Sequence, residues 1–169
     1  MEITLDQLLA ARDRRWQLQQ KLLHDNPAMV PVCLTIVMPG SVKRNKESLI
    51  AAHAAVEALK SSFDGSIAFC KECDLPTGYE AYLLINQDAA KAKEIACTIE
   101  ESHPLGRLFD IDVIGKDGIP LSRSSVGVAA RRCLLCNNEA RYCMRNHSHS
   151  IEELQKHISQ MIDDYVHRV

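Results

Sequence analysis

The order of apolar and helix-forming segments is the feature that most constrains the fold of this chain. Beyond residue 30 the pattern predicts strand, helix, strand, strand, helix and strand, with the helices at 47–60 and 88–102 and the strands at 30–38, 66–71, 79–86 and 108–114. This order is typical of a split β-α-β (ferredoxin- or palm-like) core. We therefore predict an α+β fold with helices on one face of a mixed or antiparallel sheet of about five strands, the fifth being a hairpin return at 119–122.

Helices are also expected at both ends of the chain. Thr4 begins a capping box in front of a helix over 5–24, and Ser150 caps a last helix that runs to about residue 165. The segment 133–146 also has helical spacing. A chain of 169 residues has the length of one domain, and we assign a single domain to 1–169.

Composition excludes several classes of protein. No apolar run approaches the roughly 20 residues of a membrane-spanning helix, and the first residues lack the basic and apolar regions of a signal peptide. Seven cysteines, an odd number, without an export signal predict reduced thiols and a cytoplasmic location. The net charge of -2 argues against a general nucleic-acid binder.

The charges are unevenly distributed along the chain. Residues 51–102 contain four basic and nine acidic side chains, whereas 103–150 contain seven basic and four acidic ones. Six of those seven basic residues are arginines, whose planar fork matches phosphate and carboxylate groups. This segment is therefore expected to meet a small anionic ligand or an acidic partner.

The strand expected at 108–114 carries the strongest indication of chemistry. Alternation places Asp110 and Asp112 on one face and the apolar residues between them on the other. Two carboxylates on Cα atoms about 6.5–7 Å apart can hold one Mg²⁺ ion, which is common in phosphoryl transfer. The alternative is a solvated strand face. Aspartate is disfavoured in strands, so two among bulky apolar residues favour a functional role.

Several residues near this strand and after the first strand are candidates for ligand binding. Gly106 permits close approach of the backbone to a ligand, and Arg107 supplies a positive charge. His103 can titrate near neutral pH, although a lone histidine more often has a structural role. Gly40 and Lys43 can present N–H groups and an ammonium to phosphate, without the spacing of a P-loop.

Cys133, Cys136, Cys143 and His149 are residue types that bind zinc. The three cysteines also fall near one face of a helix, where cysteine acts as a small buried apolar residue. On an unbroken helix Cys133 and Cys143 would be about 15 Å apart along the axis, so zinc requires a break at Asn137-Asn138. We favour the packed helix and keep structural zinc as the alternative.

Taken together, these motifs resemble the citrate lyase holo-acyl-carrier-protein synthases, which are also called apo-citrate lyase phosphoribosyl-dephospho-CoA transferases. The resemblance covers nearly the whole chain, and its most specific part is the run 103–113. Further agreement comes from 131–136 with Cys143 and His149, from Arg12 and Arg15, and from Gly40 with Lys43.

The resemblance implies a nucleotidyltransferase-type reaction. The donor would be 2'-(5''-triphosphoribosyl)-3'-dephospho-CoA, the acceptor a serine of the acyl carrier (gamma) subunit of citrate lyase, and the leaving group diphosphate. Asp110 and Asp112 would hold Mg²⁺, and one of them or His103 would accept the serine proton. The donor would be bound by glycine and basic residues, namely Gly40, Lys43, Gly106, Arg107, Arg131 and Arg132, with Arg12 and Arg15 on the first helix.

Two other functions remain open from the sequence. A non-catalytic module, stiffened by zinc, could dock on an acidic carrier protein through residues 123–145. Such a module would tolerate asparagine at both aspartate positions. A nucleotidyltransferase that uses ATP or CTP would share the metal site but would prefer another donor, which a panel of donors would identify.

Overall fold

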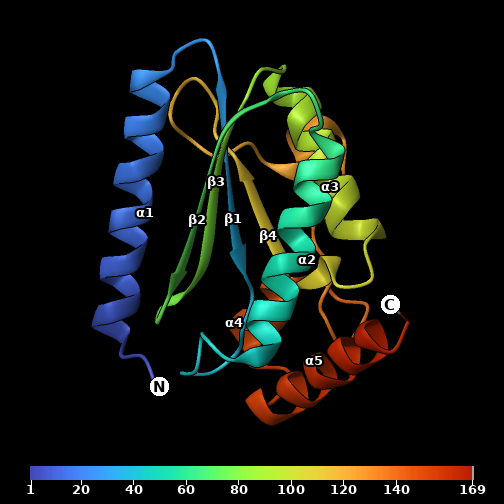
Figure 1. Cartoon of the computed structure of the whole chain (residues 1–169). Coiled ribbons are helices and arrows are strands. Elements are labelled where there is room, and N and C mark those ends of the chain that lie inside the picture. The colour runs from blue at the N-terminus through green and yellow to red at the C-terminus, as the bar shows by residue number, and fades with distance from the viewer. Residues whose placement is uncertain (169) are drawn as a thin grey trace.

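One open sheet of four antiparallel strands forms the centre of the fold. The computed structural model describes residues 1–168 and gives the strand order β2-β3-β1-β4 (Figure 1). The strands are β1 (Val30–Ile36), β2 (Ile67–Leu75), β3 (Gly78–Ile85) and β4 (Phe109–Val113). Because β3 lies between β1 and β2, the strands that a helix connects, the order confirms the predicted split β-α-β arrangement.

The sheet has one strand fewer than the sequence predicted. The expected return strand at 119–122 is reduced to a single bridge between Ile114 and Pro120. Leu121 adds one backbone hydrogen bond to the carbonyl of Val113, at 2.8 Å. The hairpin beyond β4 is therefore a short loop beside the end of the strand, and β4 is the edge strand of the sheet.

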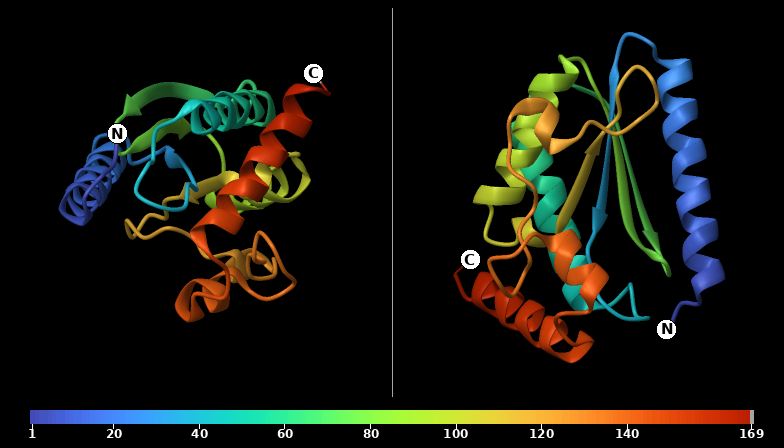
Figure 2. Two further views of the ribbon diagram at one scale, coloured as in Figure 1. Left: turned by 90° about the horizontal axis from the view of Figure 1, so that it is seen from below. Right: turned by 180° about the vertical axis from the view of Figure 1, so that it is seen from behind.

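The apolar core lies between the sheet and two helices, α2 (Lys46–Ser62) and α3 (Ala89–Ser102), which cover the same face (Figure 2). Alternate residues of each strand point toward these helices. The strand residues buried there are Val32, Leu34, Ala81, Leu83, Ile85, Phe109, Ile111 and Val113. Removing this surface from water is the main favourable contribution to folding.

The helix α1 (Leu5–Asp25) lies on the opposite face of the sheet (Figure 1). Thr4 and Gln7 form the predicted capping box at its N-terminus. Along its length only Ala11 and Gln19 are buried, so α1 brings few apolar side chains to this face. The second face of the sheet is consequently mixed, because Cys33, Tyr82 and Leu84 are buried there beside a layer of polar side chains.

The segment after the sheet departs most from the prediction. We favoured a packed helix over 133–146, and this is wrong, because helix is confined to α4 (Ala140–Asn146). The residues before α4 form a short hairpin, in which Arg132 bridges to Glu139 and the N–H of Cys133 donates to the carbonyl of Asn138 at 2.7 Å. The chain is therefore not helical at Asn137-Asn138, the position at which zinc binding required a break in the helix.

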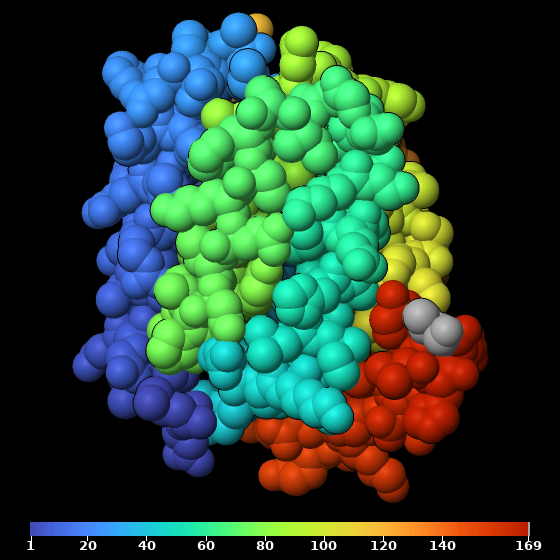
Figure 3. Space-filling model, in the orientation of Figure 1, coloured from blue at the N-terminus to red at the C-terminus, as the bar shows by residue number. Residues whose placement is uncertain are grey.

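The last helix, α5 (Ile151–Val166), crosses one end of the molecule (Figure 1). It buries Ile158 and Ile162 against the core, and Ser159 donates to Glu47 of α2 at 2.5 Å. In the space-filling view, α1, β2 and α2 form a continuous surface over the sheet edge opposite β4 (Figure 3). Among residues 1–168, no helix has the length and apolar character needed to span a membrane.

Candidate functional site

Asp110 and Asp112 lie together on the α1 face of β4. In the register of the sheet, Asp110 is opposite Thr35 and Asp112 is opposite Cys33 of β1. The hydroxyl of Thr35 donates to Asp110 Oδ2 at 3.5 Å. The side chain of Asp110 is 52% exposed, and Asp112 is half-buried. The pair therefore extends from the polar layer beneath α1 out to the solvent.

The two carboxylates repel each other, so the pair does not stabilise the fold, but it forms a suitable cation site. Burial raises the pKa of Asp112 from 3.8 to about 6, and the neighbouring carboxylate of Asp110 adds to the rise. The positive charges of Lys93 and Arg15 act in the opposite direction. A divalent cation between two such carboxylates would remove their repulsion, and oxygen ligands of this kind are those that Mg²⁺ prefers.

A buried carboxylate on β3 completes the polar layer. Glu80 is 3% exposed and lies in the same row of the sheet as Thr35 and Asp110. It accepts a hydrogen bond from Arg15 Nη1 at 2.9 Å and another from the hydroxyl of Tyr82 at 2.5 Å. Arg15 is thereby fixed against the sheet on the face that holds the aspartates.

Arg131 reaches the aspartates from the C-terminal segment. Its Nη2 lies 2.9 Å from Glu100 Oε1 and 4.0 Å from Asp110 Oδ1, and it also donates to the carbonyl of Phe109. Glu100, which is 4% exposed, pairs in addition with Arg123 at 2.5 Å. Arg123 also pairs with Glu101 at 2.9 Å, so the two arginines link two carboxylates of α3 to the segment that follows β4.

Side chains occupy the outer edge of β4. The N–H of Ile111 donates to Glu100 at 2.9 Å, and its carbonyl accepts from Lys93 Nζ at 3.2 Å. The carbonyl of Val113 accepts from the N–H of Leu121. Because buried backbone groups without partners are costly, these contacts allow α3 to pack against an edge strand.

An arginine-rich cavity adjoins this edge. Its volume is about 310 Å³, and the residues that line it are Glu100, Glu101, Arg107, Arg123, Ala129, Ala130, Arg131 and Arg132. Arg107 donates to the carbonyls of Arg132 and Cys133, the latter at 2.7 Å, and Arg132 donates to the carbonyl of Asn137 at 2.9 Å. The structure thus brings together three of the arginines that the sequence singled out, with Asp110 next to one of them.

His103 lies away from this group. Its ring packs between Phe109, at 4.9 Å between centroids, and Tyr165, at 5.5 Å. Its Nδ1 accepts the N–H of Leu105 at 3.0 Å, and burial lowers its pKa. Phe109 belongs to the apolar face of β4, so the imidazole lies on the side of the sheet opposite Asp110.

Gly106 has a packing role instead of the ligand-binding role that we expected. It is buried in the 3-10 turn η1 (Gly106–Leu108), against the end of α3. A Cβ atom there would lie 2.5 Å from the carbonyl oxygen of Glu100 and 2.6 Å from that of Ile99. The backbone that approaches this glycine is therefore the protein's own helix.

The remaining predicted residues lie elsewhere. Lys43 donates to the carbonyl of Met38 at 2.6 Å, and burial lowers its pKa. Gly40 has a φ of +83° and packs against α5. Arg12 is exposed on α1. Within residues 1–168, neither Lys43 nor Arg12 forms an ion pair or hydrogen bond with the aspartates, whereas Arg15 lies on their face of the sheet.

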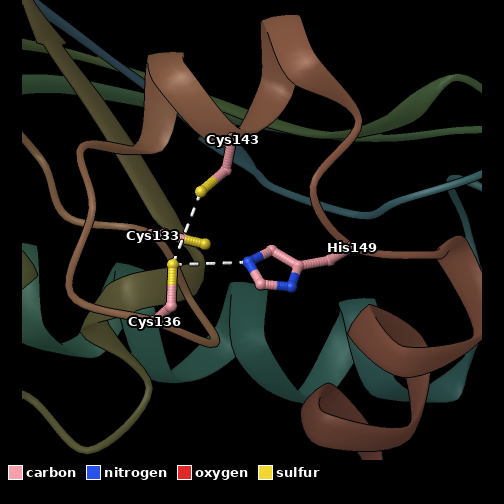
Figure 4. Close-up of side chains that lie close together, drawn as sticks. All are labelled: Cys133, Cys136, Cys143 and His149. Atoms are coloured by element: carbon pink, nitrogen blue, oxygen red, sulfur yellow. Dashed lines mark hydrogen bonds between the residues drawn. The ribbon is translucent and has the colours of Figure 1, made fainter.

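A second cluster, formed by Cys133, Cys136, Cys143 and His149, is a possible metal site (Figure 4). One ligand atom from each residue lies within 4.8 Å of all the others. Cys136 Sγ is 3.5 Å from Cys143 Sγ and 3.4 Å from His149 Nε2. The hairpin supplies two cysteines, α4 supplies the third, and the histidine precedes α5, so the four side chains converge from three parts of the segment.

Sequence reasoning missed three charged residues around the aspartates: Glu80, Lys93 and Glu100. Each is at most 5% exposed. A signal was present for all of them, because Glu80 interrupts an apolar strand, and Lys93 and Glu100 stand seven residues apart on the buried side of α3. Charges at positions predicted to be buried require partners, and here the partners come from distant segments.

Comparison with known proteins gives consistent matches over almost the whole chain. The model of the family described as "Apo-citrate lyase phosphoribosyl-dephospho-CoA transferase" matches residues 3–165. A probable apo-citrate lyase phosphoribosyl-dephospho-CoA transferase of Vibrio cholerae serotype O1 (strain M66-2) is 37% identical over 98% of this chain and 94% of its own length. Its counterpart in Streptococcus pyogenes serotype M18 is 31% identical, with 98% and 88% covered. Protein CitXG of Haemophilus influenzae is 35% identical over 97% of this chain and 36% of its own length.

Proposed function

Because the chain belongs to the apo-citrate lyase phosphoribosyl-dephospho-CoA transferase family, we propose that Asp110 and Asp112 form the catalytic centre of that transfer. The protein is a transferase that attaches the 2'-(5''-phosphoribosyl)-3'-dephospho-CoA prosthetic group to the apo acyl carrier subunit of citrate lyase. In this reaction the serine oxygen forms a bond to the phosphorus next to the ribose, and the bond to the departing diphosphate breaks.

The observation that carries the proposal is the pair of carboxylates on one face of β4, with an arginine 4.0 Å from Asp110. The two aspartates would hold Mg²⁺, which in such enzymes offsets the charge on the transferred and departing phosphates. Asp110 is the solvent-facing member and Asp112 the buried one. Their unequal burial gives the pair one ligand that is accessible to the donor and one that the fold holds in place.

The donor triphosphate fits the arginine-rich cavity beside the aspartates. Arg131 and Arg132 line this cavity and come from consecutive positions of the chain. Arg107 lines the same cavity, and because its Nη2 donates to the carbonyls of Arg132 and Cys133 it also positions the backbone of Arg132. Binding and orienting the phosphates is the main task of residues in phosphoryl-transfer enzymes.

The proton of the acceptor serine needs a base within hydrogen-bond reach. An aspartate fits this role better than His103, because the imidazole packs between Phe109 and Tyr165 on the far side of the sheet. Lys43 and Gly40, which follow the end of β1, would contribute to donor binding.

The cysteine and histidine cluster has another role. Three thiolates and one imidazole are the ligand set of structural zinc, and four protein ligands leave no open position for a substrate. We therefore assign magnesium to the aspartates and zinc to the Cys133–His149 cluster, and only the first ion takes part in transfer.

Carrier labelling tests the catalytic assignment. Mass spectrometry of the apo carrier after incubation with donor, Mg²⁺ and this protein should reveal an added phosphoribosyl-dephospho-CoA group. Asp110→Asn and Asp112→Asn should each slow labelling by at least about a thousandfold, because each removes a charged metal ligand. Asp64→Asn, an exposed position in the turn before β2, is the matched control. Labelling within a few-fold of the unsubstituted protein in both aspartate variants would refute the proposal.

A further inference from the structure

The segment 131–150 has little apolar interior of its own. Its buried side chains are those of Cys133 and Cys143. Its helix, α4, has seven residues, and helices this short are unstable without tertiary support. Tyr142 and Met144 of α4 are 57% and 74% exposed, so they contribute little packing. A stable fold of this segment therefore requires a further source of stability.

The geometry of the four converging side chains fits one tetrahedral ion. With Zn–S distances of about 2.3 Å and Zn–N of about 2.0 Å, ligand atoms in a tetrahedral site are about 3.5–3.8 Å apart. The observed separations of 3.5 Å between two sulfur atoms and 3.4 Å between sulfur and imidazole nitrogen are close to these values. Figure 4 shows the side chains of Cys133, Cys136, Cys143 and His149 pointing toward a common centre.

The same segment carries the arginines of the cavity. Cys133 follows Arg132 directly, and its carbonyl accepts a hydrogen bond from Arg107. Arg131 closes the hairpin, because its carbonyl accepts from the N–H of Ala140 at 2.8 Å. Fixing Cys133 therefore fixes the backbone that carries Arg131, which reaches β4, and Arg132, which lines the cavity beside it.

From this arrangement we infer that Cys133, Cys136, Cys143 and His149 bind one zinc ion, and that this ion holds Arg131 and Arg132 in position to bind a polyphosphate. The zinc-bound segment acts as a positioning element, since its ligands do not touch the phosphates. The inference rests on the proposed function only for the nature of the ligand, the triphosphate of the donor. The zinc site itself stands on geometry alone.

Metal analysis tests whether the four side chains bind zinc. Protein purified without a His tag should contain one zinc per chain by mass spectrometry of the metal. Cys136→Ser and His149→Ala should lower the zinc content, whereas Cys73→Ser, which removes a half-buried thiol of β2 outside the cluster, should not. Replacement of zinc by cobalt should give the absorption of a tetrahedral thiolate site. Less than about a tenth of an equivalent of any metal, with the cysteines unoxidised, would overturn the site.

Binding of inorganic tripolyphosphate tests whether zinc positions the arginines, and this measurement does not depend on transfer activity. Titration calorimetry, in the absence of Mg²⁺, compares zinc-loaded, chelator-treated and zinc-restored protein. Removal of zinc should weaken binding by about tenfold or more, as expected for the loss of charge-assisted hydrogen bonds, and restoring zinc should reverse the loss. Far-UV circular dichroism should remain close to that of the loaded form, because the core lies between the sheet and the helices α2 and α3.

The outcomes separate this inference from the catalytic proposal. Equal tripolyphosphate affinity with and without zinc would overturn the link between the ion and the arginines. Conversely, full labelling by Asp110→Asn would refute the catalytic assignment while one zinc per chain and zinc-dependent tripolyphosphate binding still support the inference made here.

Discussion

The two faces of the sheet differ although the same strands build both. Toward α2 and α3, β4 presents Phe109 and Ile111, which are at most 1% exposed. Toward α1, the residues between and after them are Asp110 and Asp112, beside the buried Glu80 of β3. One face gains its stability from apolar burial, and the other contains charges that need partners or a cation. Substitutions on β4 should therefore affect either stability or transfer, according to the face.

The largest difference in stability between substitutions on the two faces is expected at the neighbouring positions 109 and 110 of β4. Phe109→Ala should lower the free energy of unfolding by about 3–4 kcal/mol, because it opens a cavity in the core and removes the ring contact with His103. Urea unfolding followed by circular dichroism measures this value. Asp110→Asn, on the other face, is the matched control and should change the stability by less than about 1 kcal/mol. Equal losses at both positions would contradict the division of the two faces.

A double-mutant cycle examines the buried charge of the polar face. Glu80→Gln should destabilise the protein by about 2 kcal/mol, less than the 3–5 kcal/mol typical of a fully buried pair, because Arg15 is 25% exposed. When Arg15→Gln is already present, Glu80→Gln should cost less, and the difference is the coupling energy. Additive effects of the two substitutions would mean that the ion pair with Arg15 contributes nothing to the stability that Glu80 provides.

The smallest expected effect is a gain in stability and not a loss. The pKa of Asp112 is raised from 3.8 to about 6, so its ionised form destabilises the fold as the pH rises through 6. Asp112→Asn should therefore stabilise the protein at pH 8 by about 1–2 kcal/mol in the absence of Mg²⁺, and by less at pH 5. Thermal or urea unfolding at the two pH values measures the change. A loss of stability at pH 8 would show that the carboxylate has a structural role.

The sequence predicted the polar and apolar positions of β4 because strand alternation is a local rule. With a side-chain period of two, residues 110 and 112 share a face once the strand exists. The partners of Glu100 were not predictable in this way, since Arg123 and Arg131 lie 23 and 31 positions further along the chain. Strand alternation also does not predict which face of the sheet His103 contacts, because His103 lies before the turn that leads into β4.

The helical prediction for 133–146 failed for a different reason. Cysteines at 133, 136 and 143 satisfy the spacing of a helix face and the spacing of a metal site equally well. Hydrophobic periodicity indicates only which side chains a helix would bury. It carries no information about the free energy of metal binding. The Asn137-Asn138 pair was the local indication of a turn, and the four candidate ligands, two before it and two after it, were the indication of an ion.

The edge of β4 also limits how a partner protein can approach. Exposed strand edges commonly recruit another chain by adding a strand to the sheet. Here Glu100 and Lys93 occupy both backbone groups of Ile111, and Arg131 and Leu121 occupy the carbonyls on either side. We therefore expect the acyl carrier subunit to approach β4 through contacts between side-chain surfaces and not by adding a strand at this edge. A recognition of that kind can release the modified carrier without disturbing the sheet.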